Sequence, residues 1–283
     1  MNFSRVAYAF MFLSATLLAP QFASAQLQTE ATNPTPIIIG ESWTIESEAL
    51  GATRTYNVWL PPSYATSDER YPVLYVIDGG LEQDFHHISG LAQLGSVAAM
   101  FREVIVVGIE TKDRQSELTY RSDDAEHIKE FPTHGHSDSF RAFIRDEVMT
   151  EVNARYRTSG EDALIGESLA GLFIAETFLK APDTADIYIA ISPSMWWDRE
   201  SLGKGSRADL KAMQASERKL YLTIANEGGM MRRGVLALVT ALKAEKAPGL
   251  AWTFSDRPDL EHSTIYHREA LEALVWAFKK DDE

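Results

Sequence analysis

The chain has 283 residues, with 27 lysines and arginines against 41 aspartates and glutamates, which gives a formal net charge of −14. This acidity argues against nucleic acid or an anionic membrane surface as a partner. The absence of cysteine excludes disulfides, a thiolate nucleophile and thiolate metal ligands. Hydrophobic residues make up 45% of the chain, enough for a large core that needs no disulfide.

The first 25 residues have the pattern of a secretory signal peptide. Arg5 precedes an apolar run from Val6 to Ala19, and Ala23-Ser24-Ala25 forms a small-residue cleavage sequence. The apolar run is shorter than the roughly 20 residues of a membrane-spanning helix, which disfavours an anchor. We therefore expect a periplasmic or secreted protein. The expected organisation is a signal peptide over residues 1–25, a flexible arm over 26–40 and a single domain over 41–283.

Two kinds of strand pattern follow along the chain. Residues 43–45 and 56–60 alternate apolar and polar side chains on either side of a turn at Gly51, which indicates antiparallel strands with one exposed face. From Tyr71 the apolar runs become short and nearly continuous, which is typical of parallel strands buried on both faces. These runs cover residues 72–78, 104–110, 163–166, 187–192 and 219–225, and 250–256 adds a final strand.

Helix-length segments with one apolar stripe separate the later strands. They cover residues 139–156, 169–181, 234–246 and 263–280. Strands that alternate with helices predict an α/β fold, with a mostly parallel central sheet covered by helices on both faces. Residues 111–138 fit no element, and a loop of this length is usually functional or disordered. Because it follows a central strand, we expect it at the carboxyl edge of the sheet, where such sheets bind ligands.

Residues 166–170, with the sequence GESLA, fit the pattern G-x-S-x-small between an apolar strand and an amphipathic helix. In a nucleophile elbow the serine adopts a strained turn conformation, so the residues two positions away must be small. The helix that begins there directs its positive end toward an oxyanion. An ordinary strand–helix joint would also use small residues, but the strand–turn–helix context favours Ser168 as a nucleophile.

A serine hydroxyl needs a base within hydrogen-bond reach, and in this architecture the acid and then the histidine follow the serine along the chain. His262 lies between the last strand and the last helix, which places it at the catalytic edge and favours it as the general base. His267 falls one turn into that helix, where a solvated side chain is the simpler interpretation.

The acid of the triad is less clearly marked. Glu227 follows the strand 219–225 and lies between the serine and the histidine in sequence, so we favour it. Asp198, after the preceding strand, is the alternative. Asp259 and Glu261 stand so close to His262 in sequence that the usual geometry becomes awkward, and we interpret them as solvated surface residues.

Two backbone N–H groups are needed for an oxyanion hole. One is expected from Leu169, directly after the nucleophile, and one from the loop after the first buried strand, where Gly80 or Leu81 is the candidate. An ordinary turn also explains Gly79-Gly80, and the two interpretations are compatible.

Other polar and aromatic residues each allow two interpretations. Arg114 could orient an acceptor on the substrate or form a structural salt bridge, and Trp196 and Trp197 could line a pocket or pack in the core. The histidines of the long loop match no specific ligand spacing, and a polar active-site lid explains them equally well. We expect no metal and no other cofactor. The three histidines are His127, His134 and His136.

Several blocks together resemble the esterase group of the α/β-hydrolase superfamily that includes esterase D-type enzymes and the enterobactin and salmochelin siderophore esterases. The blocks are VWLPPSY, YPVLYVIDGG, DRQSELT, FIRDEVMTEVNARYRT, IGESLAGLF, ISPSMWWD and the terminal histidine–helix unit. The resemblance runs from about Trp43 to the end. It implies Ser168 as nucleophile and His262 as base, and Glu227 falls where an acid is expected. Ala170 replaces a common glycine of this family, and Glu167 stands where histidine or tyrosine is frequent.

The residues and the resemblance together predict an exported serine hydrolase that cleaves carboxylic esters of small molecules through an acyl-enzyme on Ser168. A periplasmic ferric-siderophore trilactone esterase is the alternative within the enzyme class. The high negative charge tempers that alternative, because iron–siderophore complexes are anionic. An inactive hydrolase-fold binding protein is a third hypothesis, since fold alone does not assure function.

Overall fold

The computed structural model describes residues 34–213, 215 and 217–280. The predicted signal peptide and the first part of the predicted arm lie outside these residues. Residues 34–38 belong to a first unit, and residues 39–283 form a second, compact unit that holds the helices and strands below. No helix within the described ranges combines the length and the apolar character needed to cross a bilayer.

In the part of the chain that the structure describes, eight strands form one sheet in the order β1-β2-β4-β3-β5-β6-β7-β8. β2 runs antiparallel to both β1 and β4, and all neighbours from β4 to β8 are parallel. This confirms the predicted mostly parallel sheet with antiparallel N-terminal strands. The strands are β1 (Glu41–Ser47), β2 (Ala52–Trp59), β3 (Tyr71–Ile77), β4 (Ile105–Ile109), β5 (Thr158–Glu167), β6 (Ile187–Ile191), β7 (Arg218–Ile224) and β8 (Leu250–Asp256).

Helices occupy the connections between the strands. They are α1 (Phe85–Val97), α2 (Arg114–Glu117), α3 (Ala125–Glu130), α4 (Ser137–Ala142), α5 (Met149–Arg155), α6 (Leu169–Lys180), α7 (Trp197–Ala212), α8 (Gly229–Ala244) and α9 (His262–Ala277), with a 3-10 turn at Pro62–Ala65. A π-helical turn at Phe143–Val148 joins α4 to α5 within the predicted helix 139–156. α2 and α3 lie in the stretch 111–138, for which the sequence predicted no element.

Besides α2 and α3, the longer helices α1 and α7 were not predicted either. Each contains two glycines, which lower helix propensity. In addition, α7 begins with three residues in left-handed conformations, Asp198, Arg199 and Glu200, with φ values of 46°, 53° and 65°. No amphipathic pattern of a regular helix can reveal such a start.

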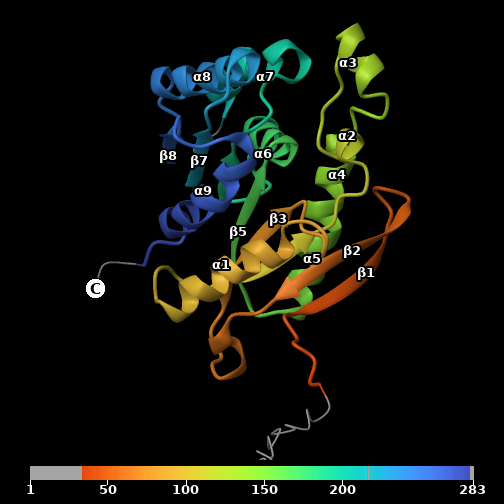
Figure 1. The fold of residues 1–283 in the computed structure, drawn as a ribbon, viewed down its shortest axis with the longest axis vertical. Helices are drawn as coiled ribbons and strands as arrows, with labels where there is room; N and C mark the ends of the chain where they lie inside the picture. Colours follow the sequence, from red (N-terminus) through yellow and green to blue (C-terminus); the bar gives the residue numbers. More distant parts are fainter. Residues whose placement is uncertain (1–33, 214, 216, 281–283) are drawn as a thin grey trace, which may run out of the picture. The chain divides into compact units, whose positions relative to one another are not determined.

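The core consists of two apolar clusters, one on each face of the sheet. Side chains alternate along a strand, so Tyr75 of β3 belongs to one cluster while its neighbours Leu74 and Val76 belong to the other. The first cluster includes Phe173 of α6, and the second includes Leu274 of α9. Figure 1 shows α1 and α9 together in front of the sheet. The predicted helix cover on both faces is therefore confirmed.

The loop after β3 is pressed against the backbone of β4. A Cβ atom added to Gly79 would lie 2.3 Å from Gly108 Cα and 2.5 Å from the backbone nitrogen of Ile109. The same loop contains Asp78, whose φ of 60° is in the left-handed region. Glycine at position 79 thus fixes the path of the loop from which an oxyanion donor was predicted.

Replacing Gly79 by alanine is expected to lower the free energy of unfolding by about 2 kcal/mol or more, because overpacking against backbone atoms cannot be relieved by a side-chain rotation. Gly90→Ala is the matched control. Position 90 lies in α1 with no atom within 4 Å of an added Cβ, so alanine there should stabilise by roughly 0.5–1 kcal/mol. Urea unfolding measures both, and equal stabilities would contradict this account of the loop.

Candidate active site

Ser168 occupies the sharp turn between β5 and α6. Its φ is 62° and its ψ is −118°, a strained conformation for a residue with a side chain. A Cβ added to Gly166 would lie 2.6 Å from Ala170 Cβ, and one added to Gly171 would lie 2.9 Å from the carbonyl oxygen of Ile191. The turn therefore requires the small residues of the sequence pattern, and the methyl group of Ala170 leaves no room for a side chain at position 166.

His262 lies directly beside this serine. Its Nε2 is 3.0 Å from Ser168 Oγ. His262 is the first residue of α9, and a capping box between Glu261 and Thr264 fixes the start of that helix. The N–H of Asn226 donates to the carbonyl of Leu260 at 2.7 Å, which ties the segment before α9 to the loop after β7.

That loop after β7 carries Glu227, whose Oε1 contacts His262 Nδ1 at hydrogen-bond distance. An ionised carboxylate only accepts hydrogen bonds. The proton of the neutral imidazole therefore belongs on Nδ1, which leaves Nε2 free to accept the hydroxyl proton of Ser168. The structure thus brings these three predicted site residues into one hydrogen-bonded chain.

Asp198, the competing candidate for the acid, is directed elsewhere. Ser122 Oγ donates to its Oδ1 at 2.8 Å, and its backbone N–H donates to His127 Nδ1 at 3.1 Å. These contacts tether the α2–α3 stretch to the left-handed start of α7. Of the two candidates, only Glu227 contacts the histidine in the described part of the chain.

Two serines after β6, for which no separate prediction was made, complete the arrangement. Ser192 Oγ donates to Glu227 Oε1 at 2.9 Å and accepts from the N–H of Ala225 at 3.2 Å, so it orients the carboxylate. The N–H of Ser194 donates to the Ser168 carbonyl at 2.9 Å, and the two hydroxyl oxygens are 3.3 Å apart. The feature of the sequence that could have indicated these serines is the tripeptide Ser-Pro-Ser at the carboxyl end of a buried strand.

The predicted oxyanion donors differ in whether their N–H groups already have a hydrogen-bond partner. Leu169 is the first residue of α6, so its N–H has no partner within the helix. The N–H of Gly80, however, donates to Gln83 Oε1 at 2.8 Å, so Gly80 is wrong as a free donor in this structure. The N–H of Leu81 makes no hydrogen bond within the described residues. Gln83 also donates from Nε2 to Thr111 Oγ1 at 3.0 Å, which anchors the loop.

Arg114 makes the salt bridge that was one of its two predicted roles. Its Nε lies 2.8 Å from Asp78 Oδ2, and 43% of its side chain is exposed. Its positive charge lowers the pKa of Glu167, although burial of that carboxyl group dominates the shift. Arg114 is therefore a fixed, half-exposed cation beside the site.

The two tryptophans differ in position. Trp197 is fully buried, its indole N–H donates to the Tyr120 carbonyl at 2.9 Å, and its ring stacks on His127 at 5.1 Å. This corresponds to core packing, so a pocket-wall role for Trp197 is wrong in this conformation. Trp196 is only half-buried and lies 5.7 Å from the ring of Phe131. Of these two tryptophans, Trp196 alone is partly exposed to solvent.

The histidines of the long loop have other partners. His127 packs on Trp197, and His134 Nδ1 lies 2.7 Å from the carbonyl of Phe131. His136 precedes α4. Among the residues described, no cluster of three or more acidic, histidine or cysteine side chains could hold a metal ion.

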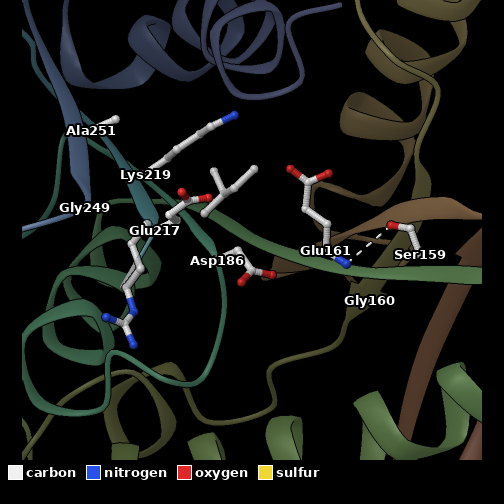
Figure 2. A pocket seen from close by; sticks show the side chains of 10 residues that line it. Ser159, Gly160, Glu161, Asp186, Glu217, Lys219, Gly249 and Ala251 are labelled. Carbon is white, nitrogen blue, oxygen red and sulfur yellow. Dashed lines mark hydrogen bonds between the residues drawn. The ribbon is translucent and has the colours of Figure 1, made fainter. Parts of the chain in front are cut away.

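A cavity of about 690 Å³ lies away from these residues. Figure 2 shows its lining, which includes Glu161 near the start of β5, Asp186 just before β6 and Lys219 near the start of β7. Ser168 follows the opposite, carboxyl end of β5. Since ligands of open parallel sheets bind at the carboxyl edge, this cavity is not the substrate site of the serine.

The electrostatics of the site centre on His262 and two glutamates. The hydrogen bond to Glu227 raises the pKa of His262; burial opposes this shift, and the negative charge of Glu167 supports it. Burial raises the pKa of Glu167 to about 7, opposed by the positive charges of His262 and Arg114. The two carboxylates thus favour a protonated His262, while burial favours a protonated Glu167.

Comparison with known proteins identifies the family. Residues 47–247 match the model of the Esterase family, described as "Putative esterase". The chain belongs to this esterase family. The match includes Ser168 and Glu227 and ends before His262. The contact between His262 and Ser168 comes from the structure and not from the family match.

Several relatives of this esterase-family chain are named as siderophore esterases. Ferri-bacillibactin esterase BesA of Bacillus subtilis is 29% identical over 168 residues, which cover 52% of this chain and 56% of that protein. The chain thus spans just over half of that relative's length. Apo-salmochelin esterase of Escherichia coli is 25% identical over 252 residues, which cover 81% of this chain and 76% of that protein. The predicted resemblance to siderophore esterases is confirmed.

A solved structure shows the same fold. An IroE-like serine hydrolase from Shewanella oneidensis superimposes with a TM-score of 0.79 at 25% sequence identity, and the alignment covers 86% of this chain and 82% of that one. The predicted α/β-hydrolase fold is thereby confirmed.

The raised pKa of Glu167 predicts a pH-dependent stability. Because the folded chain binds this proton more tightly than the unfolded chain, the contribution is complete below the unfolded value of 4.5 and is lost as the pH rises through about 7. Glu167→Gln removes the effect, so the variant should gain on the order of 3 kcal/mol relative to the original chain between pH 4 and pH 8. Urea unfolding at both pH values measures this gain. The same stability difference at the two pH values would show that Glu167 does not titrate in this way.

Proposed function

We propose that the protein is an exported hydrolase of carboxylic esters of small molecules, with Ser168 as nucleophile, His262 as general base and Glu227 as the orienting acid. The observation that carries the proposal is the unbroken contact from Ser168 Oγ through the His262 ring to Glu227. A serine hydroxyl needs such a base to become a nucleophile. Export rests on the signal-peptide pattern of residues 1–25.

In the first half-reaction, Ser168 Oγ attacks the acyl carbon while His262 Nε2 takes the hydroxyl proton. Glu227 stabilises the resulting imidazolium and keeps Nδ1 protonated. The tetrahedral intermediate collapses when His262 gives its proton to the leaving alcohol, and the acyl group stays on Ser168.

In the second half-reaction, a water molecule attacks the acyl-enzyme. His262 takes a proton from this water and returns it to Ser168 Oγ as the acid leaves, which restores the resting state. In both halves the N–H groups of Leu169 and Leu81 would hold the oxyanion, since neither donates a hydrogen bond among the residues that the structure describes.

A second candidate is hydrolysis of a ferric trilactone siderophore. Two relatives are named as esterases of ferri-bacillibactin and apo-salmochelin, and Arg114 offers a half-exposed positive charge beside the site. The net charge of −14 opposes the approach of an anionic complex over longer distances. A panel of nitrophenyl esters of different chain length, feruloyl and acetylated sugars and a ferric trilactone siderophore distinguishes the candidates by kcat/KM.

Ser168→Ala is expected to abolish hydrolysis of 4-nitrophenyl acetate, because the variant cannot form the acyl-enzyme. Initial rates monitored at the absorbance of nitrophenolate measure the loss, and a circular dichroism spectrum checks the fold. Turnover that survives in the folded variant would refute the role of Ser168. An original chain that cleaves none of the panel would instead support a hydrolase-fold binding protein.

Glu227→Gln is expected to lower kcat about 10³–10⁴-fold. The amide can donate a hydrogen bond to His262 Nδ1 and so hold the imidazole in the wrong tautomer. Asp198→Asn is the matched control, since it removes the same charge from the competing candidate and should leave kcat within about threefold. Steady-state kinetics on the same ester decide between them. A large loss in Asp198→Asn with an active Glu227→Gln would reverse the assignment.

A further inference from the structure

Glu167 presents a second group to the catalytic face of His262. Its Oε1 lies 3.1 Å from His262 Nε2, the same nitrogen that is 3.0 Å from Ser168 Oγ. The Glu167 side chain is only 20% exposed. One ring nitrogen therefore faces both the nucleophile and a carboxylate.

Nothing in the local fold explains this carboxylate. The buried Oε1 makes no hydrogen bond within the described residues, so the carboxylate does not brace the turn through this atom. A buried, unsatisfied oxygen costs free energy. Within the described residues, its ion-pair partner is the catalytic imidazole.

Other charged and titratable groups face Glu167 from every surrounding element. They are His262 and Tyr266 of α9, Glu227 after β7, Arg114 of α2 and Asp84 before α1. The carboxylates of Asp84 and Glu227 disfavour the ionised form of Glu167, and the cations of His262 and Arg114 favour it. Among them, an ion pair with Glu167 is found only for His262 in the described chain.

We propose that Glu167 is a positioning residue for His262: its carboxylate stabilises the imidazolium through Nε2 and thereby sets the pH at which His262 can take a proton from Ser168. The inference rests on the proposed hydrolase function and deepens it. Glu167 itself neither touches the acyl group nor takes a proton in either half-reaction.

The protonation states give this arrangement its effect. With neutral His262, Nε2 accepts the Ser168 hydroxyl. After proton transfer, Nε2 carries the proton, can hold it in a hydrogen bond with the Glu167 carboxylate, and then gives it to the leaving alcohol. Negative charge beside the imidazolium strengthens the base, and it also keeps the resting histidine protonated up to a higher pH. Because the pKa of Glu167 is about 7 and its Oε1 contacts the His262 ring, the two groups titrate as a coupled pair.

The test is the pKa of His262, measured by NMR on ¹⁵N-histidine-labelled full-length protein. Glu167→Gln keeps the size of the side chain and removes its charge, so the pKa of His262 should fall by about one unit. Glu272→Gln is the matched control, because this exposed residue of α9 lies about 15 Å along the helix from His262. It should leave the pKa of His262 unchanged. An unchanged pKa of His262 in Glu167→Gln overturns the inference.

The kinetic counterpart is the pH dependence of kcat/KM for 4-nitrophenyl acetate. In Glu167→Gln the acid limb of the pH profile should move to lower pH by about one pH unit, as the pKa of His262 does. The value of kcat/KM on the high-pH plateau should fall several-fold. Glu167→Asp, which keeps the charge, should restore part of both effects. An acid limb that stays in place in Glu167→Gln also overturns the inference. The NMR result does not depend on turnover, so failure of the hydrolase proposal and failure of the role of Glu167 remain distinguishable.

Discussion

The left-handed turn at Ser168 is the constraint on which the rest of the site depends. Its strain, of order 1–3 kcal/mol, is held by hydrogen bonds on both sides. The Ser168 N–H donates to Ile191 of β6 at 3.1 Å, and its carbonyl accepts from Leu172 of α6 at 2.9 Å and from Ser194 at 2.9 Å. These bonds fix the backbone so that the hydroxyl leaves the end of β5 toward the histidine. Glycine is needed at positions 166 and 171, because a Cβ atom there would clash with Ala170 and with the Ile191 carbonyl, respectively.

The parallel sheet then brings the partners to the same edge. Ser168, Glu227 and His262 follow the ends of β5, β7 and β8, and the carboxyl ends of parallel strands face the same way. Backbone bonds join the last two loops directly, from Arg257 to Ile224 at 2.8 Å and from Asn226 to Leu260 at 2.7 Å. The distance between acid and histidine is therefore set by main-chain contacts and by the Ser192 hydroxyl. Glu167, the last residue of β5, lies at the same edge for the same reason.

Sequence patterns predicted the strands, the sheet type and the residues at the carboxyl edge, because buried parallel strands have an apolar signal and their ends are easy to locate. They left Glu227 and Asp198 as alternatives, since both follow a strand and only the direction of each side chain separates them. They missed Ser192, which donates a hydrogen bond to Glu227, 35 positions along the chain. They also missed the hydrogen bond from the Gly80 N–H to Gln83. The helix α7 was missed because its left-handed start has no periodic signature. Such features arise from tertiary contacts, which single-sequence periodicity does not encode.

The central claim is that the contact with His262 makes Ser168 a nucleophile. The most direct measurement is covalent labelling with a fluorophosphonate, followed by mass spectrometry of the peptides. The account predicts one adduct per chain, located on Ser168, and its loss in His262→Ala. Labelling of another residue, or labelling of Ser168 at the same rate without His262, would contradict it.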